Sequence, residues 1–200
     1  MVLQCDIEAM VLSDRTIKEE IAKGRIVIEP LALSCIQPAS IDLHLDKKLL
    51  VFRRQRYPSY IDIRQNLSDL NELVEIDEDN AFFLNPAEFV LASTLELLTL
   101  PDDIVGRLEG KSSLGRIGLL IHSTAGYVDP GWQGHLTLEL SNVAKLPIAL
   151  YYKMEIGQIS FLQLTSSVDR PYGSPGLGSR YQGQTEPTAS RYYEDFRKEL

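Results

Sequence analysis

EGKSSLGRIGLLIHSTAGYVDPGWQGHLTLE, residues 109–139, is the stretch around which the rest of the chain is arranged. Seven of the 13 glycines lie in it or just before it, and glycine lets a backbone approach a ligand closely. The same stretch holds the cations Lys111 and Arg116, and it ends in a run of alternating apolar and polar residues. Alternation of this kind is typical of a half-buried strand. Glycine turns beside positive charge, leading into a strand, favour a phosphate-binding loop on a β-rich fold.

Further strand patterns lie on both sides of this stretch. Short apolar segments, separated by turns rich in Gly, Pro and Asn, are predicted to be strands at 25–30, 37–52, 82–94, 116–122, 135–140, 146–152 and 155–164. One short helix is expected at about 14–23, with Gly24 as its stop. The spacing predicts an all-β sandwich, jelly roll or barrel. Because strands and helices do not alternate, a doubly wound nucleotide-binding fold is not expected.

The bulk properties are those of one ordinary globular domain over 1–200. The composition is 44% hydrophobic and 24% charged, and the net charge of −8 argues against a general nucleic-acid or membrane binder. The two cysteines form no close pair, so we expect no disulfide framework, no metal knuckle and a reduced, cytoplasmic setting. No apolar run approaches the ~20 residues needed to span a bilayer. The segment 1–12 is expected to be an extension without a secretory signal.

Two segments look unlike the rest. Residues 53–80 are polar, first basic and then acidic, and we expect a solvated excursion there. The tail, 172–200, is rich in Gly, Pro, Ser and Tyr and cannot form a core by itself. It is either a disordered end or a lid that orders over a ligand, with Arg180 as its charged tip.

Two familiar kinds of site are excluded by spacing. A GxxxxGK[ST] phosphate loop is absent, because GKSS at 110–113 lacks the upstream glycine at the right offset, and we do not expect it to open a helix. Zinc-dependent nucleobase deaminases need H-x-E and P-C-x-x-C, which the three histidines and two cysteines do not supply. Any hydrolysis is therefore expected to rely on a carboxylate base and not on zinc.

Glu139 is the candidate base. In HLTLEL the leucines point to one face, and His135, Thr137 and Glu139 point to the other. A strand carboxylate is often simply solvent-exposed, and that interpretation stays open beside the catalytic one. The glycine-rich turn before the strand favours catalysis, since a hydrolytic base must be an enclosed carboxylate that faces a polarised water.

Other polar groups of the stretch allow two interpretations each. Asp129, before a Pro-Gly pair, is either a turn former or a carboxylate presented to a sugar hydroxyl. Lys111 and Arg116 would elsewhere be solubilising charges, but among so many glycines we favour phosphate ligands. Ser112 and Ser113 are placed to donate to phosphate or to position a water.

Long motifs in order resemble one known family, the dCTP deaminases, which share the trimeric dUTPase-like fold. They are LSDRTIKEEI, QPASIDLHL, RLEGKSSLGRIGLLIHSTAGYVDPGWQGHLTLELSN, IGQISFLQL and PYGSPGLGSRYQGQ, and they span nearly the whole chain. The resemblance implies a distorted jelly roll, or β-clip, with a short N-terminal helix. It also implies a homotrimer with active sites between subunits, dCTP as substrate, dUTP and dTTP as further ligands, and Mg²⁺ carried by the triphosphate.

The resemblance also assigns roles to residues. Glu139 matches the glutamate that activates water to attack C4 of cytosine, and Ser112 and Arg116 match residues near that water. Asp129 matches the residue that holds the deoxyribose 3′-hydroxyl. The full nucleotide-binding set implied is Lys111, Ser112, Ser113, Leu114, Gly115, Arg116, Asp129, Thr137, Leu138, Glu139, Gln158, Tyr172, Arg180 and Gln184. The family more often has Lys where this chain has Arg180, which keeps the charge but changes the geometry.

Members of the family differ in their product. Those that stop at dUTP carry TAH and a basic residue before IDPG, whereas those that also cleave the triphosphate to dUMP carry TAG with an aromatic. Here the residues are Gly126 and Tyr127, together with Gln158 in the IGQ motif, which resemble the dUMP-forming branch. Gly126 would leave room for a water near the α-phosphate, and Asp129 would orient or deprotonate it.

Four rival functions are weighed against this hypothesis. The nearest is a deaminase that releases dUTP, followed by a dUTPase without deamination. A non-catalytic nucleotide sensor would need a missing catalytic position, and none is missing here. A carbohydrate-binding jelly roll would not explain the three cations Lys111, Arg116 and Arg180, because a neutral sugar needs no cationic cradle.

Overall fold

A computed structural model of the chain describes residues 10–52, 60–122 and 124–197. The expected helix is present as α1 (Asp14–Ala22), which buries Ile17 and is followed by Gly24 at φ +70°. The other helical segments are α2 (Ser112–Gly115) and the 3-10 segments η1 (Leu33–Cys35), η3 (Ser68–Leu70) and η4 (Tyr192–Arg197). Part of the predicted extension, 1–9, lies outside the described residues.

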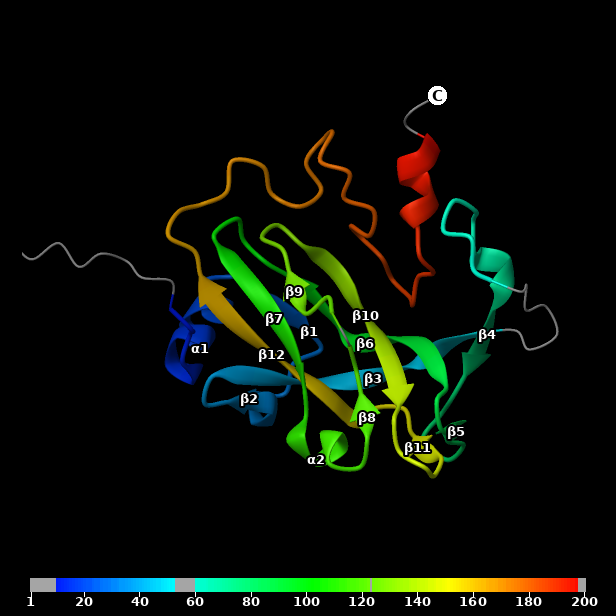
Figure 1. The fold of residues 1–200 in the computed structure, drawn as a ribbon. Helices are drawn as coiled ribbons and strands as arrows, with labels where there is room; N and C mark the ends of the chain where they lie inside the picture. Colours follow the sequence, from blue (N-terminus) through cyan, green and yellow to red (C-terminus); the bar gives the residue numbers. More distant parts are fainter. Residues whose placement is uncertain (1–9, 53–59, 123, 198–200) are drawn as a thin grey trace, which may run out of the picture.

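Strands make up the body of the molecule (Figure 1). They are β1 (Val27–Glu29), β2 (Ile36–Gln37), β3 (Ser40–Phe52), β4 (Asn71–Glu75), β5 (Phe82–Leu84), β6 (Phe89–Thr99), β7 (Ile104–Gly110), β8 (Leu119–Leu120), β9 (Tyr127–Val128), β10 (Gln133–Asn142), β11 (Ile148–Leu150) and β12 (Glu155–Gln163). Ten of them form one antiparallel sheet in the order β8-β10-β6-β3-β12-β7-β9, with β1 beside β6 and with β2 and β4 beside β3. The all-β, distorted jelly-roll prediction is confirmed.

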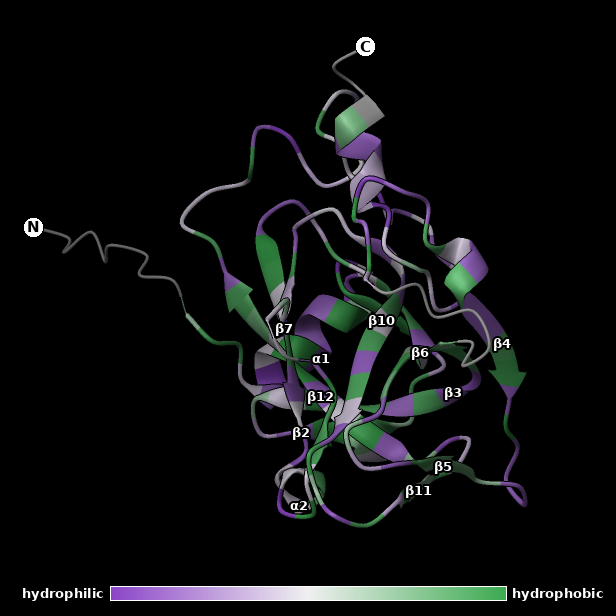
Figure 2. Cartoon of the chain, turned by 45° about the vertical axis from the view of Figure 1, so that its right-hand side comes forward, coloured by the Kyte–Doolittle hydropathy of each residue, from purple (hydrophilic) through white to green (hydrophobic). Residues whose placement is uncertain are grey.

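The long strand β3 joins the two halves of the curled sheet. Its first half pairs with β12, where Ile41 lies opposite Ile159, and its second half pairs with β6, where Leu49 lies opposite Ala92. Figure 2 shows apolar and polar residues alternating along β3 and β10. The apolar side of each strand is turned inward, and Phe161 of β12 is among the largest fully buried side chains of this core.

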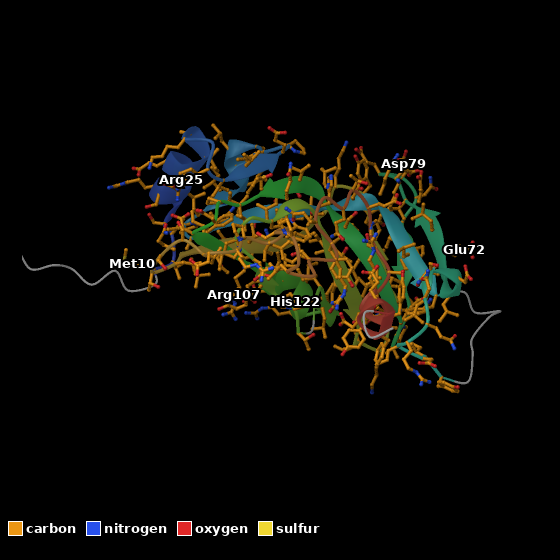
Figure 3. All side chains as sticks on the ribbon, turned by 90° about the horizontal axis from the view of Figure 1, so that it is seen from above. Met10, Arg25, Glu72, Asp79, Arg107 and His122 are labelled. Carbon is orange, nitrogen blue, oxygen red and sulfur yellow. The ribbon has the colours of Figure 1, made fainter. Side chains whose placement is uncertain are left out.

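Two predicted segments differ from the structure. The apolar run 116–122 forms a strand only at Leu119–Leu120, because Gly118 adopts φ +89° and packs against Ala144, which interrupts the extended backbone. The polar excursion contains the unpredicted strand β4, which pairs with β3 at the sheet edge. Figure 3 shows Glu72 and Asp79 on this outer side, away from His122. The basic part of the excursion, 53–59, lies outside the described residues.

Candidate active site

A cleft of about 450 Å³ opens between β9, β10 and the tail. It is lined by residues from distant parts of the chain: Phe52, Leu67, Asn71, Phe89, Leu91, Leu108, His122, Ala125, Tyr127, Val128, Asp129, Trp132, Leu136, Thr137, Glu139, Tyr172, Tyr181, Gln184, Thr188, Ala189 and Ser190. Six of the predicted site residues are therefore brought together: Tyr127, Asp129, Thr137, Glu139, Tyr172 and Gln184.

Strand β10 presents the candidate base to the cleft. Its leucines are buried as predicted, and Leu138 is fully buried and does not line the cleft. Thr137 and Glu139 are half-buried on the other face and line the cleft. The backbone N–H of Glu139 donates to the carbonyl of Ile121 (2.8 Å), which fixes the strand at the point where the carboxylate projects. The geometry suits a base that acts on a water held in the cleft.

Asp129 begins a tight turn at the edge of the cleft. The backbone N–H of Trp132 donates to the carbonyl of Asp129 (3.1 Å), and Gly131, the third residue of the turn, has φ +85°. That conformation favours glycine. The exposed carboxylate of Asp129 is held at the cleft by this turn.

The tail closes one side of the cleft. Gln184 Nε2 donates to the carbonyl of His135 (2.6 Å) and to Thr137 Oγ1 (3.0 Å), which ties the tail to the polar face of β10. Gly134, at φ +141°, makes this approach possible, because a Cβ there would lie 2.9 Å from the carbonyl oxygen of Gln184. Tyr172 packs on Trp132 with ring centroids 5.4 Å apart. The tail is thus docked along the cleft over several residues.

Gly126 lies in a confined place. A Cβ at this position would lie 3.1 Å from the carbonyl oxygen of Leu108 and 3.2 Å from His122 Cε1. Its neighbour Tyr127 is largely exposed and lines the cleft. A larger side chain in place of Gly126 would therefore have to move the His122 ring, which itself lines the cleft.

A second group of predicted residues lies outside the cleft, around α2. In Figures 1 and 2, α2 lies at the bottom of the molecule, with the tail and η4 at the top. GKSS does open a single helical turn, contrary to our expectation, since Gly115 N–H donates to the carbonyl of Lys111 (3.0 Å). The predicted ligands Ser112, Ser113, Gly115 and Arg116 are exposed there, and Leu114 is half-buried. None of them lines the cleft.

Lys111 anchors this second group. Its Nζ lies 2.9 Å from the buried Asp42 and 2.5 Å from Glu155. Burial of the ammonium opposes its charge, but the hydrogen bonds to Glu155 and Asp42 prevail and raise the pKa of Lys111. The same contact lowers the pKa of Glu155. The ammonium is thus held charged by two carboxylates of the same chain.

Gln158 belongs to the same group. Ser40 Oγ donates to Gln158 Oε1 (2.9 Å), and Asp42, opposite Gln158 in the sheet, accepts from Gln37 Nε2 (2.9 Å). The motif QPASID therefore supports both Lys111 and Gln158, although the sequence had indicated only a strand there. The cationic segment and its supports form a surface of their own.

Arg180 lies in neither group. Its guanidinium forms an ion pair with Asp195 and lies over the ring of Tyr192, with Cζ 5.8 Å from the ring centroid. The hydrogen bond with Asp195 raises the pKa of Arg180 further above its ordinary value. Arg180 lines a separate polar hollow in the tail, next to the cleft.

Comparison with known proteins decides the family. The family model described as "dCTP deaminase-like" matches residues 11–164, most of the chain. The chain belongs to the dCTP deaminase-like family. Curated relatives called "dCTP deaminase, dUMP-forming" come from Acidothermus cellulolyticus (57% identical over 189 residues), Nocardia farcinica (58% over 187) and Mycolicibacterium smegmatis (57% over 189). Each alignment covers 94% of this chain, and it covers 98%, 94% and 100% of the respective relative.

A solved structure agrees with the fold of this deaminase-like chain. The 2′-deoxycytidine 5′-triphosphate deaminase from Agrobacterium tumefaciens superposes with a TM-score of 0.61 at 24% sequence identity. The match covers 78% of this chain and 48% of that one, so this chain spans about half the length of that structure. At 24% sequence identity, this similarity supports the fold alone.

Several cleft residues of the deaminase-like chain are not predicted by any pattern in its sequence. Phe52 and Phe89, with ring centroids 6.3 Å apart, form an apolar end of the cleft because β3 and β6 are neighbours in the sheet, which no local pattern reveals. His122, which no sequence motif assigns to the site, lines the cleft, and its buried Nδ1 has no hydrogen-bond partner among the described residues. Its place in the glycine-rich stretch was the signal that could have found it.

The donor set of the cleft does not form a metal site by itself. Within 10–52, 60–122 and 124–197, no group of three His, Cys, Asp or Glu side chains could hold a metal ion. Asp129 and Glu139 are the acidic residues that line the cleft. A magnesium ion that arrives on a triphosphate needs no such protein site, because phosphate oxygens and waters supply most of its ligands.

No helix in the described ranges is long and apolar enough to cross a bilayer.

Proposed function

We propose that this protein hydrolyses dCTP in a deamination coupled to triphosphate cleavage, so that dCTP and two waters give dUMP, ammonia and diphosphate. The observation that carries the proposal is the half-buried Glu139, which β10 presents to a cleft of nucleotide size. Relatives at 57–58% identity that carry the name of this reaction support it.

The deamination is assigned to Glu139. Its carboxylate takes a proton from the attacking water as oxygen bonds to C4 of cytosine, and it returns a proton to the amino group, which leaves as ammonia. Thr137, which lines the cleft, and the neighbouring Leu138 are assigned to the base, and Asp129, at the turn, is assigned to the deoxyribose 3′-hydroxyl. Gln184 and Tyr172 close the cleft from the tail.

The phosphates are assigned to the cationic groups. Arg116, Ser112 and Ser113, with Lys111, Leu114 and Gly115 in the same segment, bind phosphate and the reacting water, and Gln158 and Arg180 complete the set. The segment around α2 is exposed and lies outside the cleft of its own chain. We therefore propose a homotrimer in which α2 of one subunit completes the cleft of its neighbour.

The second hydrolysis is assigned to the edge of the cleft at Gly126 and Tyr127. A water there attacks the α-phosphate, oriented or deprotonated by Asp129, and diphosphate leaves. Mg²⁺ carried by the nucleotide phosphates would supply neutralisation of the charge on the leaving diphosphate. dUTP and dTTP are proposed to enter the same cleft. We propose a cytoplasmic protein that is one domain over 1–200, with 172–200 as its lid.

Product analysis tests the proposal against its alternative, a deaminase that stops at dUTP. The protein is incubated with dCTP and Mg²⁺, and nucleotides, ammonia and diphosphate are quantified over time. Equal amounts of dUMP, ammonia and diphosphate are expected, without a dUTP intermediate. Accumulated dUTP without diphosphate would establish the alternative, and release of diphosphate without ammonia would reject deamination itself.

A further inference from the structure

The tail contains a polar hollow of about 230 Å³ beside the cleft. Its lining residues are Arg180, Tyr181, Gln182, Gly183, Gln184, Thr185, Glu186, Thr188 and Arg191. Tyr181, Gln184 and Thr188 line both spaces, so the hollow adjoins the cleft. Glu186 accepts a hydrogen bond from Lys48 (2.8 Å), so its negative charge is already compensated by a cation of β3. The hollow is therefore lined by two guanidinium groups, of which that of Arg180 is also paired with Asp195.

Arg191 is fixed at the wall of this hollow. Its backbone N–H donates to the hydroxyl of Tyr181 (3.1 Å), and its guanidinium donates through one nitrogen to the carbonyl of Arg180 (2.7 Å). A guanidinium carries five N–H donors in a planar fork that matches phosphate oxygens. Most of the donors of Arg191 are therefore left for an anion.

Arg180 already holds an anion. Asp195, from η4, pairs with one terminal nitrogen of the guanidinium, while the buried Nε has no hydrogen-bond partner among the described residues. A carboxylate thus satisfies only part of this group. Phosphate offers more charge and more acceptor oxygens to the same fork, so the two anions must compete for it.

We propose that Arg191 is a second phosphate-binding cation in this hollow, and that Asp195 is a built-in competitor that occupies Arg180 until phosphate displaces it. The identity of the ligand, the terminal phosphates of a nucleoside triphosphate, rests on the proposed function. The anion chemistry of the hollow does not. Binding of the triphosphate would release η4 from Arg180, and loss of diphosphate would let Asp195 return.

Calorimetric binding of inorganic diphosphate with Mg²⁺, and separately of dCMP, to the full chain tests this. Asp195→Asn is expected to bind diphosphate about tenfold more tightly, and Arg191→Gln about tenfold more weakly, which corresponds to about 1.4 kcal/mol each. Neither is expected to change dCMP affinity. Matched controls are the exposed Asp169→Asn and Arg170→Gln, since Arg170 likewise donates to a backbone carbonyl (Pro175, 2.9 Å) but does not line the hollow.

The outcomes are separable. Unchanged or weaker diphosphate binding by Asp195→Asn would contradict the proposal that Asp195 competes with phosphate. If Arg191→Gln lost as much affinity for dCMP as for diphosphate, the role of Arg191 would be structural. Hydrogen exchange of 192–196 in the unsubstituted protein needs no variant: faster exchange on adding diphosphate is expected, and slower exchange would overturn the displacement. A protein that binds diphosphate in this way but releases no ammonia from dCTP would fail the proposed function and keep this inference.

Discussion

The cleft and the α2 segment make an instructive pair, because each holds what the other lacks. The cleft has concavity, two carboxylates and a docked tail, but among the described residues that line it there is no lysine or arginine. The α2 segment has Lys111, Arg116 and two serines, but Arg116 and the serines are exposed and none of the four lines the cleft. A highly charged triphosphate needs both. The difference teaches that the residues we propose for one site lie on two separate surfaces of a single chain, which is why the proposed function places them together between subunits.

Loss of the base should have the largest effect. Glu139→Gln keeps the size of the side chain but removes its basicity, so we expect ammonia release from dCTP to fall about 10²- to 10⁴-fold. Nucleotide affinity and thermal unfolding should change little, because Glu139 forms no part of the buried core. The measurement is initial-rate ammonia release beside calorimetric dCTP binding. If the variant still released ammonia at the normal rate, deamination would not take place in this cleft.

Mixing two inactive variants asks whether the halves meet between subunits. Arg116→Gln alters only the α2 segment and Glu139→Gln only the cleft. If a site takes its cleft from one subunit and α2 from its neighbour, chains unfolded together and refolded as random trimers should recover about a quarter of the normal activity. The physical reason is that a site is intact when both of its contributing subunits carry the unaltered half.

The control for this mixture is the pair of variants refolded separately and then combined, which should stay inactive until subunits exchange. Each variant refolded alone sets the background. Activity that stays at that background after co-refolding would mean that both halves act within one chain. The separation of the cleft and the α2 segment in this structure would then reflect one conformation of the chain, and the two would come together in another.

The orientation of β10 could be predicted because apolar and polar residues alternate along it. Leu136, Leu138 and Leu140 had to be buried together, which left Glu139 on the polar side, and the structure places it there. The end of the strand predicted at 116–122 could not be predicted in this way, because Gly118 turns the chain at a position where the apolar pattern continues. The resemblance of the motifs to a known family indicated the family and its chemistry. It did not indicate on which surface of the folded chain each motif lies.

The rest of the site depends on contacts between distant residues. Phe52 and Phe89 meet only because of the sheet order, and Asp195 reaches Arg180 only after the tail has folded back. Lys111 shows the same limit: its sequence context predicts a phosphate ligand, which stays a prediction, but does not reveal Asp42 and Glu155, which hold its ammonium in the folded chain. No pattern local to Lys111 contains those partners.

Gly134→Ala would sharpen the comparison by loosening the tail at the cleft while leaving α2 untouched. A Cβ there would press on the carbonyl of Gln184 and would strain a backbone at φ +141°, at a cost of about 1–3 kcal/mol. If part of this cost falls on tail docking, the KM for dCTP should rise about tenfold. Initial rates and limited proteolysis of the tail measure it.

The matched control is Gly24→Ala, because Gly24 has φ +70° but no neighbour within 4 Å of the added Cβ. It should lower the unfolding temperature through backbone strain and leave KM unchanged. Equal KM changes in both variants would show that the effect is global instability. In that case the cleft would not depend on the docked tail.

The pH dependence of the α2 anchor should give the smallest effect. Lys111 lowers the pKa of Glu155, so the folded state holds that proton less tightly than the unfolded state does. The pair therefore stabilises the fold above the ordinary pKa of 4.5, and the contribution is lost as pH falls through the lower folded pKa. Because the Glu155 side chain is 53% exposed, screening should limit the pair to about 0.2–1 kcal/mol.

Glu155→Gln removes this contribution, so its unfolding free energy should fall below that of the unsubstituted protein at pH 7 and approach it near pH 3. Denaturant unfolding at the two pH values measures the difference. Glu78→Gln, which breaks the exposed Lys153–Glu78 pair (2.6 Å) instead, is the matched control for a surface ion pair without a site segment attached. If Glu155→Gln also weakens dCTP turnover at pH 7 while Glu78→Gln does not, the anchor serves the orientation of α2, and the two halves are linked through it. An equal loss of stability in both variants, without a loss of turnover, would show that the Lys111–Glu155 contact is an ordinary surface ion pair.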